Sequence, residues 1–286
     1  MAYVIFGIII FISAGFVSIG IYLKKSFADP VGDTIQYDSN LKIYIGGGCN
    51  SIVLTSDDGS KALIVDTKYF KGAGKLREEI NAPDITIVNT HFHMDHARGN
   101  KLYPDAYVIS GICSWKHWDF DTAHSKRPDK ALNPGEETGL KIGNENVRIM
   151  NMGSSHTSTD CVVYLENRKV LITGDIVWGR IHPMVLDPDC SISFWLKTLD
   201  KLEAAFDIKT IIPGHGNISD KSALIEMREY FLSIREAINN PEKLKLMRKK
   251  YQDFKTVPVT NSFEKIVKKI KKEINATGKI GGFTNP

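Results

Sequence analysis

The chain has 286 residues, of which 42% are hydrophobic and 24% charged, and its formal net charge is +4. There is no low-complexity run, and none of the four cysteines forms a C-x-x-C pair, so the composition is that of a globular protein without a disulfide framework. Residues 241–286 carry 12 Lys and Arg against 4 Asp and Glu, so a basic tail follows a mildly acidic body. Such a tail could bind an anionic surface, but the favoured interpretation is a solvated helix face.

The N-terminal stretch from Ala2 to Leu23 contains no charged residue. As a helix it would be about 33 Å long, enough to cross a bilayer core of about 30 Å. No Lys or Arg precedes the stretch, although a signal peptide usually begins with basic residues. We therefore expect residues 1–25 to be an uncleaved, single-pass membrane anchor, with a cleaved signal as the alternative. Lys24 and Lys25 weakly favour the cytoplasmic side for the rest of the chain.

Residues 26–40 are expected to be a linker, and the first half of the body then alternates apolar runs with turn residues. Ser56 to Gly59 is a turn signal between two apolar runs, so the runs on either side form a predicted hairpin. A short helix is expected within 75–80. The strands expected in this half are 41–45, 51–54, 62–65 and 85–88.

The second half repeats the pattern, and 114–145, rich in charge and turn formers, is expected to be a long loop or lid. The predicted strands are 106–109, 147–150, 161–165, 170–172 and 210–212, and the predicted helices are 191–206, 219–238 and 263–274. Hairpins followed by mixed strands and helices indicate an α+β protein with two sheets and helices outside. We expect a catalytic domain over 41–240 and a basic helical tail over 241–286.

Four potential metal ligands lie within six residues, directly after an apolar strand: His91, His93, Asp95 and His96. His91 and His93 are two positions apart, so in extended backbone their side chains point the same way. Asp95 and His96 can turn toward a neighbouring point, so this one loop can serve two metals.

Two metals need more ligands, and the chain offers His156, Asp175 and His215, each beside glycine or a small residue. Imidazole and carboxylate suit zinc, which keeps a position open for water in catalytic sites. Coordination to the metal then lowers the pKa of the bound water from near 15.7 to about 7. Glycines beside Asp175 and His215 would let the backbone approach closely.

These seven residues, with Asp66 after an apolar strand, resemble the ligand pattern of the metallo-β-lactamase superfamily, over about residues 43–238. The resemblance implies a four-layer αββα sandwich with a dinuclear, glyoxalase II-like site. It implies a first metal on His91, His93 and His156, and a second on Asp95, His96 and His215. Asp175 would bridge the metals, Asp66 would support the metal loop, and Asp95 and Asp175 are the expected catalytic residues.

Details of the motif distinguish this chain from several branches of the family. Zinc β-lactamases with a cysteine ligand carry it at the position of Asp175, and iron-binding flavodiiron proteins carry Glu at that of His93. Quorum-quenching lactonases carry a Tyr where this chain has Trp178, which has no phenol hydroxyl. The run from Gly174 through Pro183, with Trp195 and the stretch from Pro213 to Gly216, most resembles a general bacterial subgroup of hydrolases. The expected cofactor is a pair of zinc ions, with iron or manganese as the alternatives.

The expected function is hydrolysis of a small ester, thioester, lactone or amide by a metal-bridging hydroxide. The alternatives are a phosphodiesterase or nuclease on the same site, and an iron-dependent redox enzyme of this fold. The expected partners are a small-molecule substrate and the membrane, with no nucleic acid; the oligomeric state is not predicted. Trp178, Arg180 and His182 are the candidate substrate-binding residues. The alternative is a surface ion pair for Arg180 and an ordinary surface or core position for His182.

Overall fold

The computed structural model describes residues 31–257 and 260–277. The expected membrane anchor over residues 1–25 lies outside these described residues and stays a prediction. Within the two described ranges, no helix combines the length and apolarity that a bilayer crossing requires.

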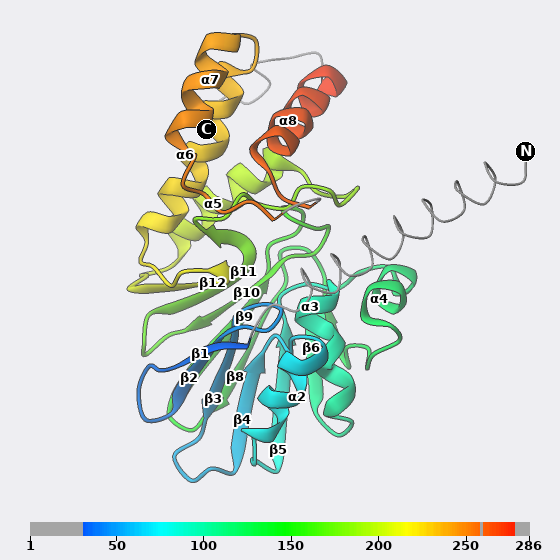
Figure 1. Ribbon diagram of the computed structural model, residues 1–286. Coiled ribbons are helices and arrows are strands. Elements are labelled where there is room, and N and C mark those ends of the chain that lie inside the picture. The colour runs from blue at the N-terminus through cyan, green and yellow to red at the C-terminus, as the bar shows by residue number, and fades with distance from the viewer. Residues whose placement is uncertain (1–30, 258–259, 278–286) are drawn as a thin grey trace, which may run out of the picture.

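Two β-sheets pack face to face, and helices cover both outer faces (Figure 1). In the first sheet the strands lie in chain order, antiparallel from β1 to β4 and parallel from β4 to β7. Its strands are β1 (Val31–Gln36), β2 (Leu41–Gly46), β3 (Ser51–Thr55), β4 (Lys61–Val65), β5 (Asp84–Asn89), β6 (Tyr107–Gly111) and β7 (Lys130–Leu132).

The second sheet has the order β12-β11-β10-β9-β8, and only its β11–β12 pair is parallel. Its strands are β8 (Glu137–Ile142), β9 (Glu145–Asn151), β10 (Cys161–Leu165), β11 (Val170–Gly179) and β12 (Thr210–Gly216). The helices are α2 (Phe70–Glu78), α3 (Met94–Ala97), the 3-10 helix η1 (Arg98–Leu102), α4 (Trp115–Thr122), α5 (Ile192–Ala205), α6 (Ser222–Ala237), α7 (Pro241–Lys250) and α8 (Phe263–Thr277).

Side chains alternate between the two faces of each buried strand, and this alternation produces the layers of the fold. In β4, Leu63 and Val65 point into the apolar core between the sheets, while Ala62 and Ile64 pack with Leu76 of α2 on the outer face. Successive side chains of a strand face opposite sides, so a run that is apolar at every position needs cover on both faces. The four-layer αββα sandwich expected from the sequence is confirmed.

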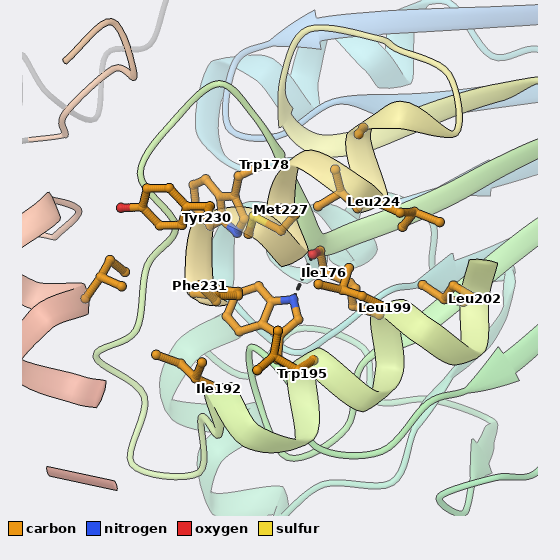
Figure 2. Close-up of a cluster of buried hydrophobic side chains, with 14 of the residues drawn as sticks. Ile176, Trp178, Ile192, Trp195, Leu199, Leu202, Leu224, Met227, Tyr230 and Phe231 are labelled. Atoms are coloured by element: carbon orange, nitrogen blue, oxygen red, sulfur yellow. Dashed lines mark hydrogen bonds between the residues drawn. The ribbon is translucent and has the colours of Figure 1, made fainter. Parts of the chain in front are cut away.

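The largest cluster of buried apolar residues lies between the second sheet and the helices outside it (Figure 2). At its centre Trp195 of α5 is fully buried, and its indole Nε1 donates to the Ile176 carbonyl at 2.8 Å. The ring of Phe231 from α6 lies 5.1 Å from that of Trp195. Residues Phe263, Ile266 and Ile270 of α8 belong to the same cluster, so part of the basic tail is built into the core.

Two expectations about connecting segments were wrong. Residues 31–36 lie in the predicted linker, but they form the strand β1, which pairs antiparallel with β2. Residues 114–145 are not one long loop, because α4, β7 and β8 occupy much of this segment.

Candidate metal centre

Asp66, at the end of β4, fixes the backbone of the metal loop. Its Oδ1 accepts a hydrogen bond from the Thr90 amide at 2.8 Å, and its Oδ2 accepts one from the Thr90 hydroxyl at 2.8 Å. The same Oδ2 lies 2.8 Å from His96 Nδ1, which leaves His96 Nε2 to face the cluster. Asp66 thus supports the loop as the resemblance implied, and it does so from a buried position with φ of 61°.

His91, His93 and His156 form the first group of candidate ligands, with one nitrogen of each lying within 4.8 Å of the others. His156 Nε2 lies 3.1 Å from His93 Nδ1. The remaining nitrogens face outward: His156 Nδ1 lies 3.0 Å from the Met184 carbonyl, and His93 Nε2 lies 3.4 Å from Asp187 Oδ2. Such partners fix which imidazole nitrogen is available to a metal.

Asp95, His96 and His215 form the second group. The first turn of α3 carries Asp95 and His96, and β12 carries His215. His215 Nε2 lies 3.2 Å from Asp95 Oδ2 and 3.4 Å from His96 Nε2. Two segments more than a hundred residues apart in the chain therefore meet at one point.

Asp175 of β11 lies between the two groups, and its two carboxylate oxygens face different groups. Oδ2 lies 3.3 Å from His156 Nε2 and 4.0 Å from His91 Nε2. Oδ1 lies 3.3 Å from His96 Nε2 and 3.4 Å from His215 Nε2. The structure thus brings together all seven residues that the sequence predicted as metal ligands.

Two glycines make this close packing of strands possible. A Cβ on Gly174, where φ is +50°, would lie 2.4 Å from Thr90 Oγ1. A Cβ on Gly214 would lie 2.0 Å from Asp175 Oδ1. The glycines beside Asp175 and His215 therefore serve close approach, as the sequence indicated.

The electrostatics of the cluster suit cation binding. Burial, helped by His96 and the other histidines, holds the pKa of His91 well below its usual range, and burial lowers the pKa of His156 to about 4. Burial alone would raise the pKa of Asp175, but His215 and His96 outweigh it and lower that pKa to about 2. Neutral His91 and His156 and an ionised Asp175 are in the protonation states that a metal requires of its ligands. Burial would also lower the pKa of His93, His96 and His215, but the anionic groups around them raise it, so a metal would displace protons from these three imidazoles.

Two atoms of the cluster carry no hydrogen bond within the described residues: His91 Nε2 and Asp175 Oδ1, both buried. A buried polar atom without a partner costs on the order of 1–3 kcal/mol, so it points to a ligand that would satisfy it. With the nitrogen- and oxygen-only donor set, these atoms fit a pair of divalent cations.

The three candidate substrate-binding residues have different surroundings. Trp178 pairs with His215 across β11 and β12, and its ring stacks on that imidazole at 4.6 Å. Arg180 is exposed and forms an ion pair with Glu226 at 3.5 Å, which was the alternative for this residue. His182 is buried in an aromatic cluster, where its Nδ1 lies 2.8 Å from the Tyr230 hydroxyl oxygen, so it occupies a core position. Of these three residues, Trp178 is the one whose ring contacts candidate ligands, namely His156 and His215.

The arrangement agrees with a comparison of the sequence with protein families. The model of the metallo-beta-lactamase superfamily matches residues 44–215, which include every candidate ligand. The chain belongs to the metallo-beta-lactamase superfamily. It is a metallohydrolase of that superfamily, with a His/Asp ligand cluster.

Among curated relatives, this superfamily member is similar to a Beta-lactamase-like protein 2 homolog from Drosophila melanogaster, 28% identical over 207 residues. That match covers 66% of this chain and 64% of the relative, so the chain spans less than two thirds of that protein's length. A Metallo-beta-lactamase type 2 from Bacillus cereus is 24% identical over 188 residues, covering 62% of this chain and 70% of the relative.

Solved structures support the same fold. A metallo-beta-lactamase from Pontibacter korlensis matches with a TM-score of 0.59 and 18% identity, covering 69% of this chain and 97% of that one. A double mutant of the sec-alkyl sulfatase PisA1 matches with a TM-score of 0.66 and 12% identity, covering 88% of this chain and 51% of that one. At these identities the likeness establishes the fold alone.

Sequence reasoning missed Asp187 and Met184, which contact His93 and His156 from the segment between β11 and α5. Their local sequence carries no motif.

Proposed function

We propose that the protein is a dinuclear zinc hydrolase that cleaves a small ester, thioester, lactone or amide. His91, His93 and His156 would hold one ion, Asp95, His96 and His215 the other, and Asp175 would contact both. When bound, the two ions would supply Lewis acidity toward a substrate carbonyl and lower the pKa of coordinated water to about 7.

The observation that carries the proposal is the orientation of the Asp175 carboxylate. Its Oδ2 faces the first group and its Oδ1 faces the second, at 3.3 Å from the nearest imidazole nitrogen in each case. A carboxylate shared in this way neutralises two neighbouring cations at once. A donor set of five histidines and two aspartates suits zinc, and iron and manganese are the alternatives that metal analysis would reveal.

Exposure shows from which side a substrate can enter. The side chains of Asp95 and His215 are 26% and 17% exposed, whereas those of His96 and Asp175 are 0% and 2% exposed. The cluster is therefore open toward solvent at Asp95 and His215 and closed behind Asp175. The carboxylate of Asp95, whose pKa is lowered by His96 and His215 against the effect of burial, is ionised there and can accept a hydrogen bond from a water or substrate group.

The family and the site together support the proposed substrate class. Two cations beside one open edge suit the polarisation of a carbonyl oxygen and stabilisation of the oxyanion that develops on it. Several relatives are named metallo-beta-lactamases, so a β-lactam amide belongs among the substrates to test. We also propose that residues 1–25 tether the catalytic domain to a membrane, on the basis of the uncharged stretch from Ala2 to Leu23.

The test is a substrate panel on the zinc-loaded chain, with chromogenic ester, thioester, lactone, β-lactam and phosphodiester substrates. We expect turnover of a carbonyl substrate, its loss with a chelator, and its return with Zn²⁺. His93→Ala should lose bound metal and activity together. Turnover of phosphodiesters alone would refute the proposed substrate class, and full activity of His93→Ala would refute the ligand assignment.

A further inference from the structure

The N-terminus of α5 depends on a carboxylate from another helix. The first residues of a helix have amide groups without intrahelical acceptors, and α5 has no acidic residue in its own first turn. The hydroxyl of its cap residue Ser191 accepts from the Phe194 amide at 3.4 Å. Glu273 of α8 accepts from the Ile192 amide at 2.9 Å, and from the Ser193 amide at 3.2 Å and hydroxyl at 2.9 Å.

The segment directly before α5, residues 180–191, contacts two candidate ligands. It supplies the Met184 carbonyl to His156 Nδ1 and the Asp187 carboxylate to His93 Nε2. Its end is tied to the loop that carries His156, because the Ser191 amide donates to the Ser155 carbonyl at 3.0 Å. The α5 N-terminus therefore holds one end of the segment that contacts the outward nitrogens of both histidines.

The C-terminal part of the chain also holds the beginning of this segment. The Lys255 amide donates to the Arg180 carbonyl at 2.9 Å, and the His182 amide donates to the Lys255 carbonyl at 3.0 Å. The buried Asn261 side chain donates to the His182 carbonyl at 2.8 Å. Residues 180–191 are thus secured at both ends by residues 255–273.

We propose that Glu273 is a positioning residue of the metal centre, acting through the α5 N-terminus on Met184 and Asp187. The proposal rests on the metal centre of the proposed function. The residues that match the superfamily end at 215, so Glu273 and its helix lie outside the matched part of the chain. In this protein a C-terminal helix completes the surroundings of a site whose ligands all lie in the superfamily region.

Two measurements on the full chain test the proposal, with the variants Glu273→Gln and Glu273→Ala. The control is Glu264→Gln, which removes the same charge from the same helix at an exposed ion pair with Arg248. Hydrogen exchange on the metal-free protein should show faster exchange over residues 184–193 in both Glu273 variants and unchanged exchange in the control. Glutamine keeps one acceptor oxygen, so its effect should be smaller than that of alanine.

The second measurement is the affinity for Zn²⁺ alone, by competition with a chromophoric chelator. Loss of a direct partner of a ligand typically weakens metal binding 10–100-fold, so for Glu273, one contact further out, we expect a loss of about 3- to 10-fold. The loss should affect one of the two zinc equivalents and be absent in Glu264→Gln.

Two outcomes would overturn the proposal while leaving the proposed function intact. One is unchanged exchange over residues 184–193 in both Glu273 variants. The other is faster exchange or a lower melting temperature together with two zinc equivalents at wild-type affinity, since Glu273 would then only cap α5. If the unmodified chain takes up no zinc, the metal centre itself is refuted, and the role of Glu273 with it.

Discussion

Substitution of Gly214 by alanine would test the packing of β12 against the Asp175 carboxylate. A Cβ at this position would lie 2.0 Å from Asp175 Oδ1, and contacts below 3.0 Å are essentially never seen for real Cβ atoms. The oxygen or the strand must therefore retreat by about 1 Å. The oxygen concerned is the one that faces His96 and His215.

The size of the effect follows from this displacement. A misplacement of 1 Å in a catalytic arrangement costs on the order of 100-fold in rate, or about 2.7 kcal/mol in activation free energy. We therefore expect Gly214→Ala to lower kcat about 100-fold and to weaken binding of the second zinc ion. The same Cβ would also lie 2.8 Å from the backbone carbon of Gly174, so some loss of thermal stability should accompany the change.

The assay combines steady-state turnover, zinc content and thermal unfolding of the variant. The matched control is Gly74→Ala in α2, where a Cβ meets nothing within 4 Å. Alanine there should stabilise the fold by about 0.5–1 kcal/mol and leave turnover unchanged. A Gly214→Ala protein with two zinc ions and a wild-type kcat would refute the reasoning, because the carboxylate would then tolerate the displacement.

Three further predictions concern other parts of the structure. Asp187→Ala, which removes the partner of His93 Nε2, should weaken zinc binding about 10–100-fold in a chelator competition; an unchanged affinity would contradict this contact. Burial alone would lower the pKa of His215, but Asp175 and Asp95 raise it, so zinc affinity should fall as the pH falls through that raised pKa. Zinc uptake near neutral pH should accordingly release protons, so the heat of zinc binding measured by calorimetry should depend on the buffer. A heat that is the same in every buffer would contradict this proton release. Trp195→Ala should cost about 3–5 kcal/mol of unfolding free energy in urea, and a loss below about 1 kcal/mol would mean that this core collapses around the gap.

The sequence predicted the buried strands well, because strands covered on both faces are apolar at nearly every position. β10 was predicted with its observed bounds, Cys161–Leu165, and every residue of it is buried. The strands that were missed, β1, β7 and β8, all lie at the edges of the two sheets. β8 alternates exposed and half-buried residues over most of its length, so its sequence looks like that of a turn-rich loop. The formation of such edge strands depends on pairing with a neighbouring strand more than on the residues of the edge strand itself.

In the candidate site, too, some residues can be identified from the local sequence, and others only from contacts that form in the folded structure. Residues 91–96 could be interpreted locally, because ligand types and spacing stand in one motif. Asp187 could not, because it lies 94 residues from His93 in the chain and meets it only in the folded structure. Arg180 and His182 were judged from their distance in sequence to Asp175, but β11 ends at Gly179 and the chain then turns toward α6 and the C-terminal segment.

The most direct test of a shared metal centre is anomalous diffraction at the zinc edge from crystals of the zinc-loaded protein. We predict two peaks about 3.5–4 Å apart. One should lie among His91, His93 and His156, the other among Asp95, His96 and His215, with one Asp175 oxygen toward each. A single peak, or a pair with Asp175 bound to only one ion, would contradict the shared centre.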